Sequence, residues 1–310
     1  MIGLLESRFS VTFRPGVNYF VGCIRPNLDP VEAFYRPLAI YLGIYFLRFA
    51  FTRYLVFLKG FKRTSLGCLV YYTNTSPNKG ATPLVFVHGL GLGLTCYVTL
   101  IQALHTIQRP VFLVELPFIV IRLHQHSAPS PETLVRAIET MLDHHAHPKA
   151  VILAHSLGTV IATWVALRAP QRLAGMILVD PVCFLLNYHH IAFNILHRVP
   201  QRWIESFFQY GAMRELSISH YISRQFYWYQ SVLFPNEKMA PMAVYLSEKD
   251  TIIDSQLVAD YLQAQNMDVH LMPGLQHAGF LIDVPWRDEI LAKINKMADL
   301  SMDEAIQGEL

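Results

Sequence analysis

The chain has 310 residues, of which 53% are hydrophobic and 15% are charged, and its formal net charge is +2. Soluble domains usually carry about 25% charged residues, so this composition indicates that apolar residues serve more than one buried core. The length fits one large α/β domain with an insertion. The four cysteines are scattered and form no C-x-x-C pair, so they indicate neither a zinc site nor a disulfide framework.

The first third of the chain is basic as well as apolar. No Asp or Glu occurs from Ala33 to Val114, although this stretch holds eight Lys and Arg residues. Runs of Leu, Ile and Phe separate the basic residues, a pattern that favours an anionic membrane surface over nucleic acid as the partner. We therefore expect residues 36–63 to contact a membrane, and we expect no nucleic-acid partner.

Leu38 to Leu58 is the segment that most resembles a membrane helix. Its uncharged part, Pro37 to Leu47, is too short to span a bilayer, which needs roughly 20 apolar residues. Arg48 and Arg53 follow. Three interpretations remain: a helix in the membrane interface with its arginines reaching outward, a tilted spanning helix, and a helix packed on the rest of the protein. We favour the first, and we expect an intracellular protein at the cytosolic face of a membrane rather than a secreted one.

From about Leu66 short apolar runs alternate with longer helical patterns, which is typical of a mainly parallel sheet covered on both faces. The short runs predict strands at Pro83–Val87, Val111–Val114, Ala150–Ala154, Gly175–Val179, Met242–Leu246 and Val269–Met272. The longer patterns predict helices at Thr95–His105, Pro131–His144, Leu157–Arg168, Ser255–Gln265 and Trp286–Met297.

One stretch, from Val182 to about Met239, contains only helical and aromatic sequence. An aromatic insertion after a strand predicts a lid over a site, and a helical layer that completes the core is the alternative. The chain is therefore divided as follows: a membrane-associating segment 1–65, a core in two parts, 66–181 and 241–300, a cap 182–240 between them, and an acidic tail 301–310.

The sequence around Ser156 carries the strongest chemical signal. The buried strand Val151-Ile152-Leu153-Ala154-His155 runs into this serine, and a helix follows at once. A sharp strand-to-helix turn exposes the serine hydroxyl and points a helix N-terminus at developing negative charge. Ala154 and Gly158, two positions before and after, are small enough to let the backbones approach, although a glycine is more usual at the first of these.

Upstream, Leu84 to Gly93 reads as a strand that ends in a His-Gly turn. Such a turn presents a backbone N–H to an oxyanion, so the amides of Leu90 and Leu157 are the expected donors. The glycines lack G-x-G-x-x-G spacing and a Walker lysine, and nucleotide binding is therefore not indicated.

Four further residues are placed at the substrate-binding side of this site: His88, Gly89, His155 and Phe184. Within this group, His88 is expected to order the oxyanion loop, and His155 is expected to shape the turn beside the serine rather than to react.

These motifs together resemble the α/β-hydrolase family over about Leu66 to Met297. The resemblance implies a mostly parallel sheet flanked by helices, with a helical cap inserted after the sixth strand. It also implies the chain order serine, acid, histidine. His277 is then the base that takes the Ser156 proton and returns it to the leaving group. Asp250 is the acid that the resemblance implies, and Asp180, which also ends a strand, is the alternative.

The sequence thus predicts a serine hydrolase that cleaves a hydrophobic, lipid-like carboxylic ester through an acyl intermediate on Ser156, with no metal and no organic cofactor. The aromatic cap, the apolar loop after Glu115 and the basic N-terminal segment favour such a substrate. Acyl transfer to an alcohol or thiol would use the same residues while excluding water. A catalytically silent, membrane-associated binding protein of the same fold is the alternative from another class.

Overall fold

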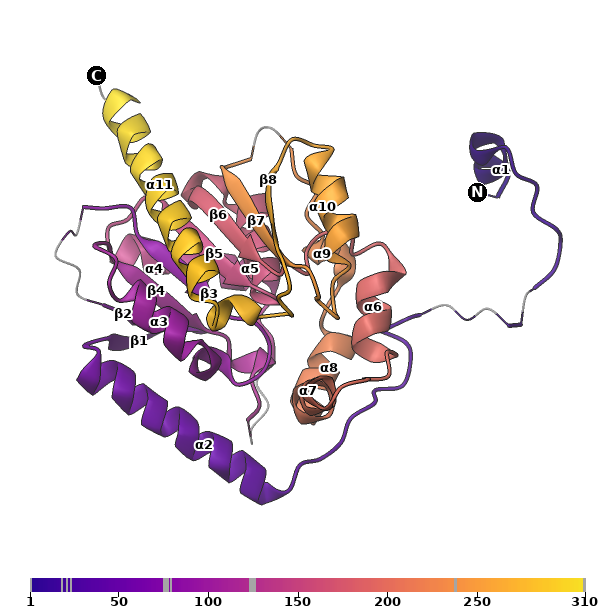
Figure 1. The fold of residues 1–310 in the computed structure, drawn as a ribbon, viewed down its shortest axis with the longest axis horizontal. Coiled ribbons are helices and arrows are strands. Elements are labelled where there is room, and N and C mark those ends of the chain that lie inside the picture. The colour runs from indigo at the N-terminus through magenta and orange to yellow at the C-terminus, as the bar shows by residue number, and fades with distance from the viewer. Residues whose placement is uncertain are drawn as a thin grey trace.

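A computed structural model of the chain describes residues 2–17, 19, 20, 22, 24–74, 78, 80–122, 127–236 and 239–308. These residues form an eight-stranded sheet in the order β1-β2-β4-β3-β5-β6-β7-β8 (Figure 1). The strands are β1 (Lys62–Leu66), β2 (Leu69–Thr73), β3 (Leu84–Val87), β4 (Val111–Glu115), β5 (Ala150–His155), β6 (Leu173–Val179), β7 (Met242–Ser247) and β8 (Asp268–Met272). β1–β2 and β2–β4 pair antiparallel, and the other five pairs are parallel.

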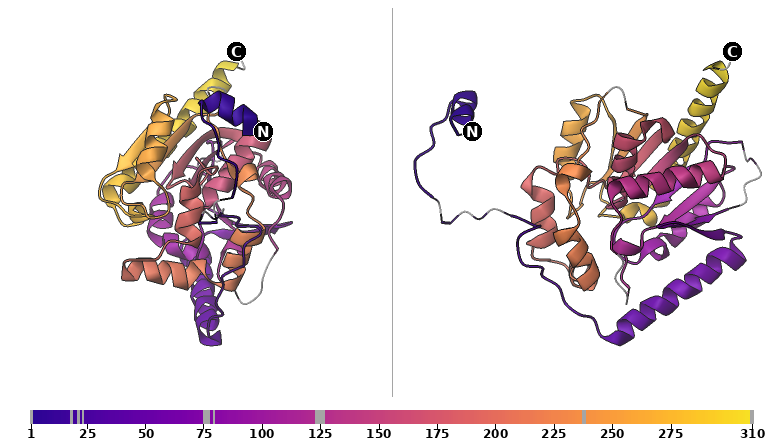
Figure 2. Two further views of the ribbon diagram at one scale, coloured as in Figure 1. Left: turned by 90° about the vertical axis from the view of Figure 1, so that its right-hand side faces the viewer. Right: turned by 180° about the vertical axis from the view of Figure 1, so that it is seen from behind.

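Helices cover both faces of this sheet, as Figure 1 and Figure 2 show. One face packs against α3 (Val98–Leu104) and α11 (Val284–Gly308), and the other packs against α4 (Pro131–His144), α5 (Gly158–Arg168) and α10 (Ser255–Gln263). Successive residues of β3 enter the two cores in turn, with Leu84 and Phe86 on one face and Val85 and Val87 on the other. Strands buried on both faces are apolar along most of their length, which is why the sequence marked them so clearly.

The sheet begins earlier than predicted. β1 pairs with β2 at the edge of the sheet, so residues from Lys62 onward belong to the core and not to the N-terminal segment 1–65. This strand begins Lys-Arg-Thr-Ser and exposes most of its side chains, so it lacks the apolar run that reveals a buried strand. At the other end, α11 continues to Gly308, where a shorter helix and a separate tail were expected.

The described residues of the insertion between β6 and β7 form helices joined by loops, and the helical cap after the sixth strand is confirmed. Its helices are α6 (His189–Leu196), α7 (Trp203–Phe208), α8 (Leu216–Arg224) and α9 (Trp228–Ser231), with a π-helical turn at Gln209–Met213.

A strap from the N-terminal segment, residues 24–36, lies across this cap, which the sequence did not indicate. The Arg224 side chain donates to the carbonyls of Pro26 at 3.0 Å and Asp29 at 2.8 Å, and Phe34 pairs with Glu215. Before the strap, α1 (Ile2–Phe9) lies away from the sheet (Figure 1).

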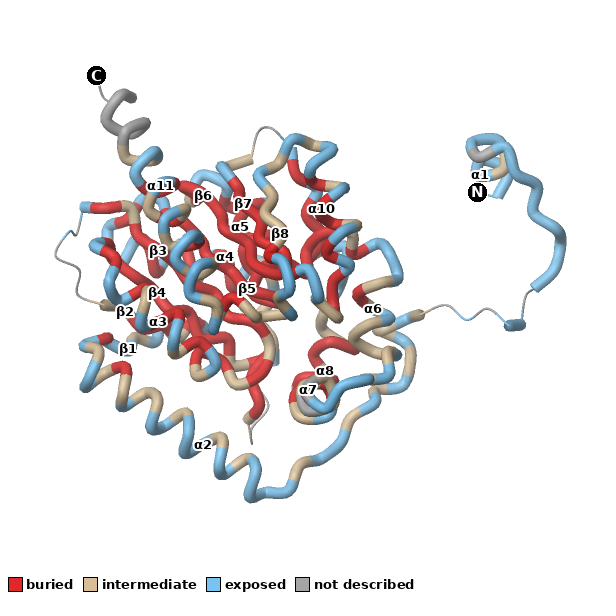
Figure 3. Tube along the Cα trace, in the orientation of Figure 1, coloured by how far each residue is buried: buried red, intermediate tan, exposed pale blue. Residues whose placement is uncertain are grey.

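Helix α2 (Leu38–Arg53) continues through a π-helical turn to Leu58 and runs along the outside of the domain (Figure 3). Within the described chain it is the one helix long and apolar enough to cross a membrane, with 21 residues and a mean hydropathy of 1.3. Its inner side is tied to the domain. Arg48 forms an ion pair with Glu115, the hydroxyls of Thr52 and Tyr72 lie 3.1 Å apart, and Leu55 is fully buried.

The outer side of α2 is apolar and exposed. Its exposed large side chains are Leu38, Ile40, Leu42, Tyr45, Phe46, Leu47, Phe49, Phe57 and Leu58. Arg53 stays on this side, with its guanidinium 5.2 Å from the ring centre of Phe49 and 5.0 Å from that of Phe57. Arg48 points inward instead, because Glu115 offers it a buried counter-charge, and this corrects the expectation that both arginines reach outward.

Candidate active site

Ser156 stands at the turn between β5 and α5. Its φ of +52° lies in the left-handed region, which costs a non-glycine residue about 1–3 kcal/mol and marks a conformation that the surroundings impose. The Ser156 amide donates to the Val179 carbonyl at 3.0 Å. A Cβ atom at Gly158 would lie 2.5 Å from the Val87 carbonyl oxygen, so the close crossing of α5 over β3 requires glycine there. The turn holds the Ser156 hydroxyl at the carboxyl edge of the sheet.

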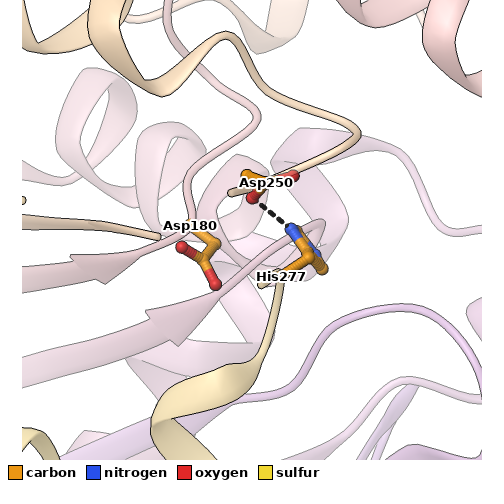
Figure 4. Close-up of side chains that lie close together, drawn as sticks. All are labelled: Asp180, Asp250 and His277. Carbon is orange, nitrogen blue, oxygen red and sulfur yellow. Dashed lines mark hydrogen bonds and ion pairs between the residues drawn. The ribbon is translucent and has the colours of Figure 1, made fainter. Parts of the chain in front are cut away.

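His277 connects this serine to a carboxylate. Its Nε2 lies 2.9 Å from the Ser156 Oγ. Its Nδ1 lies 2.6 Å from an Asp250 oxygen, and Figure 4 shows this bond. Asp250 is itself fixed, because its other oxygen accepts from the amides of Ile252 at 2.7 Å and Ile253 at 3.1 Å. The loops after β5, β7 and β8 thus bring the three predicted residues into one hydrogen-bond chain.

Asp180, the alternative acid, is fully buried beside this chain and does not bond to the imidazole (Figure 4). Its carboxylate accepts from the amide of Ser247 at 2.8 Å, the hydroxyl of Ser247 at 3.1 Å and the amide of Ala278 at 2.8 Å. Asp180 therefore holds the loop of His277 and the end of β7 in place. The geometry favours Asp250 as the partner of the imidazole.

The charges around His277 favour its protonated form. Burial by itself would lower the pKa of this imidazole. The negative charge and hydrogen bond of Asp250, with a smaller contribution from the charge of Asp180, outweigh burial and raise the pKa to about 9. With its pKa raised in this way, the His277 imidazole holds the proton that it takes from Ser156 strongly.

The two expected oxyanion donors, Leu90 and Leu157, both border the space above Ser156. Neither amide donates to another group in the part of the chain that the structure describes. The loop of Leu90 comes so close to the serine that a Cβ atom at Gly89 would lie 2.9 Å from the Ser156 Cβ. The amides of Leu90 and Leu157 are thus free to donate to an oxygen atom beside the Ser156 hydroxyl.

His88 connects this loop to the segment after β4 through two hydrogen bonds. Its Nδ1 donates to the Gly89 carbonyl at 2.6 Å, and its Nε2 accepts from the Leu116 amide at 3.0 Å. Burial lowers the pKa of His88 to about 4, so the ring is neutral and one nitrogen remains an acceptor.

Tyr97 supports the same loop, and the sequence did not reveal it. The Tyr97 hydroxyl accepts from the Gly89 amide at 2.8 Å and lies 2.7 Å from the Nδ1 of His155. No motif marks such a residue, because it belongs to an apolar segment that reads only as core.

The structure corrects the predicted substrate contacts. His88 and Phe184 are fully buried, His155 is 4% exposed, and none of them borders the cavity at Ser156. Leu90 borders the cavity, but Gly89 does not. These four residues pack under the turn at Ser156 and do not face the cavity. They therefore support the turn and are not placed to contact a substrate.

The cavity at Ser156 has a volume of about 710 Å³. Most of its wall is apolar and comes from the cap, including Ile191, Ile195, Phe208, Met213, Ile222 and Phe226. Ile24 and Leu28 of the N-terminal strap close another side. The sequence predicted a cap over a site but not the strap, since nothing in the pattern of residues 24–36 links them to a cavity.

Asp180, Asp250 and His277 are also the one group of potential metal ligands that the described residues bring within 4.8 Å. The Asp250 oxygen nearest His277 bonds to that ring, and the Asp180 oxygens bond to residues 247 and 278. The hydrogen-bond network accounts for this cluster of side chains.

Comparison with known proteins agrees with this fold. Residues 82–266 match the family described as alpha/beta hydrolase fold. The chain is 30% identical over 146 residues to a (lyso)-N-acylphosphatidylethanolamine lipase of Bos taurus, a match that covers 44% of this chain and 40% of that protein. It is 32% identical over 127 residues to the lipase of the same name from Mus musculus, over 38% and 36% of the two chains. The matches thus span about two fifths of these relatives.

Among solved structures, the 2-hydroxy-6-oxo-6-phenylhexa-2,4-dienoate hydrolase of a Rhodococcus species is similar in fold, with a TM-score of 0.56. The likeness covers 76% of this chain and 98% of that one at 14% sequence identity, and it therefore shows the shared fold alone.

Proposed function

The chain belongs to the alpha/beta hydrolase fold family, and on that basis we propose that it is a serine hydrolase of hydrophobic carboxylic esters. The observation that carries the proposal is the hydrogen-bond chain from Ser156 through His277 to Asp250, which lies at the wall of a large apolar cavity. A serine in this setting has a base within reach of its proton and two free amides beside it.

In the proposed reaction the Ser156 oxygen attacks the ester carbonyl carbon while His277 takes its proton. The carbonyl oxygen becomes negatively charged, and the amides of Leu90 and Leu157 stabilise it. The C–O bond then breaks, and His277 gives its proton to the departing alcohol. A water molecule then attacks the acyl carbon while His277 takes a proton from it. The bond to Ser156 breaks, His277 returns the proton to the Ser156 oxygen, and the carboxylic acid leaves. Asp250 stabilises the imidazolium in both halves of the reaction.

The cavity supports a lipid-like ester as the substrate. Its volume of about 710 Å³ is within the range of sites that enclose whole small-molecule ligands, and its wall is mostly aliphatic and aromatic. Burial of an acyl chain there gains about 0.8 kcal/mol for each CH₂ group removed from water. The named relatives are lipases, which agrees with this choice.

A fluorophosphonate probe tests the nucleophile directly. We expect purified wild-type protein to become labelled at Ser156, since the oxygen of an activated serine attacks the phosphorus of the probe, displaces fluoride and becomes phosphonylated. Ser156→Ala and His277→Ala should each remove the labelling, because one lacks the attacking oxygen and the other lacks its base. The measurement is in-gel fluorescence, with circular dichroism to show that each variant is folded. Absence of labelling in folded wild type, both with and without lipid vesicles, would favour a silent binding protein.

The pH dependence of hydrolysis should reflect the raised pKa of His277. Only the neutral imidazole accepts the Ser156 proton, so kcat/KM should rise about tenfold per pH unit below about pH 9 and level off above it. The measurement is kcat/KM for a chromogenic ester between about pH 6 and pH 10, corrected for spontaneous hydrolysis. A rate that is already constant above about pH 6.5 would show that Asp250 and Asp180 do not raise this pKa.

We also propose that the protein lies on the cytosolic face of a membrane with α2 in the interface. The exposed apolar side of α2 supports an apolar partner there. The inner side of α2 contacts the domain through Arg48, Thr52 and Leu55, and these contacts favour a helix in the membrane plane over a spanning helix. Burial of this side in the interface would remove its leucine and phenylalanine side chains from water.

A further inference from the structure

A second cavity lies between α2 and the antiparallel edge of the sheet. Its volume is about 580 Å³, and it shares no lining residue with the cavity at Ser156. Three arginines from separate parts of the chain border it: Arg48 of α2, Arg63 of β1 and Arg122 of the loop after β4. The proposed hydrolase reaction uses none of them.

Among the described residues, the arginines of this cavity outnumber the carboxylates that border it. Glu115 is the one carboxylate among its described lining residues, and one of its oxygens bonds to both Arg48 and Arg122, the latter at 2.8 Å. Three guanidinium groups against one carboxylate leave an excess of positive charge. Burial and the neighbouring charge of Arg48 lower the pKa of Arg122, as expected for a guanidinium that lies partly out of water beside a like charge.

Donors in the same cluster also lack acceptors. The Nη1 of Arg48 and the Nε of Arg122 are buried and have no hydrogen-bond partner within the described chain. An unpaired buried donor costs free energy, and a charged one costs more. The pairing of Glu115 with two arginines therefore leaves a cluster that an additional oxygen-rich anion would stabilise.

The remaining wall of the cavity is mostly aromatic and reaches the outer side of α2. Tyr45 and Phe49 border the cavity and are also 59% and 52% exposed, and they continue into the exposed apolar side of that helix. A ligand that fits both parts has an anionic head group and apolar chains. Guanidinium groups pair best with phosphate oxygens, because several N–H donors meet one tetrahedral group.

We propose that this cavity binds the phosphate of an anionic phospholipid whose acyl chains lie against the outer side of α2. The bound phosphate accepts from Arg63 and from the cluster of Arg48 and Arg122. The proposal concerns recognition of lipid and does not depend on the hydrolase activity at Ser156.

Arg63 gives the sharpest test, because it is exposed and pairs with no carboxylate in the described chain, so its replacement leaves no buried charge behind. Lys62 is the matched control. It is the preceding residue of the same strand, carries the same charge, is exposed, and does not border the cavity. Side chains of successive strand residues point to opposite faces, so the two substitutions remove equal charge from different sides.

The measurement is co-sedimentation of the full chain with vesicles of phosphatidylcholine alone or mixed with phosphatidic acid. The chain carries Ser156→Ala so that no lipid is turned over. We expect affinity for the phosphatidic acid vesicles to fall about tenfold with Arg63→Gln and to change less than about twofold with Lys62→Gln. Inorganic phosphate at millimolar concentration should not release the protein.

Three results would overturn the proposal. Equal losses for Arg63→Gln and Lys62→Gln would show that diffuse charge attracts the protein to the vesicles. Release by inorganic phosphate would show that the cavity takes free phosphate rather than a lipid. Equal binding to both kinds of vesicle would show that the outer side of α2 suffices without an anion.

Discussion

Replacement of Ser156 by alanine is expected to lower kcat for hydrolysis of a hydrophobic ester by about 10⁶-fold. The substitution removes the attacking oxygen, while the amides of Leu90 and Leu157 and the apolar cavity remain. Binding and oxyanion stabilisation alone leave about 10³- to 10⁴-fold catalysis over water, so KM should change little while kcat falls. Ester hydrolysis under saturating substrate measures this, with the exposed serine variant Ser65→Ala as a control that keeps full activity.

The variant Ser156→Ala/His277→Ala extends the test. Because the hydroxyl and the imidazole act as one unit through their 2.9 Å hydrogen bond, the double variant should be no slower than either single variant. If the factors by which the two single substitutions lower kcat multiply in the double variant, the two side chains act independently. Retention of more than about one tenth of the activity in Ser156→Ala would place the nucleophile elsewhere.

Much of the fold was predictable, because its central strands are buried on both faces and their sequences are therefore apolar at nearly every position. β3 and β5 are fully buried along their lengths, and both stood out as short apolar runs. The turn at Ser156 was predictable for a related reason, since a side chain at position 158 would collide with the backbone of β3 and glycine is required there. Parallel strands end at one edge of the sheet, and side chains that follow different strands, such as Asp250 and His277, meet there.

The parts that could not be predicted depend on contacts between distant segments. The side chains of Tyr97 and Arg48 look like core and interface residues in the sequence, and only the folded chain shows that they bond to His155 and Glu115. The strap over the cap is held by hydrogen bonds from Arg224 to backbone carbonyls, which have no sequence signature. The choice between Asp250 and Asp180 was open for the same reason, as both follow strands that end beside the serine.

These two carboxylates should respond differently to replacement by asparagine. Asp250→Asn is expected to lower kcat by about 10⁴-fold, because the amide no longer favours the tautomer of His277 that accepts the Ser156 proton and no longer stabilises the imidazolium. It also removes the main charge that raises the pKa of His277. The pH at which kcat/KM levels off should therefore move from about 9 to a lower value. The measurements are kcat at the plateau and the pH at which kcat/KM levels off.

Asp180→Asn should act mainly on stability. The carboxylate accepts from two amides and a hydroxyl, whereas an asparagine side chain has one acceptor and turns its NH₂ group toward a neighbouring donor. The unpaired buried group should cost about 1–3 kcal/mol of unfolding free energy, seen in thermal or urea denaturation. Its effect on kcat should be smaller than that of Asp250→Asn, because the bond between the carboxylate and the imidazole is kept. If a folded Asp180→Asn variant instead loses more activity and shows the larger pH shift, the acid of this site is Asp180, and the bond between Asp250 and His277 is not the one that supports catalysis.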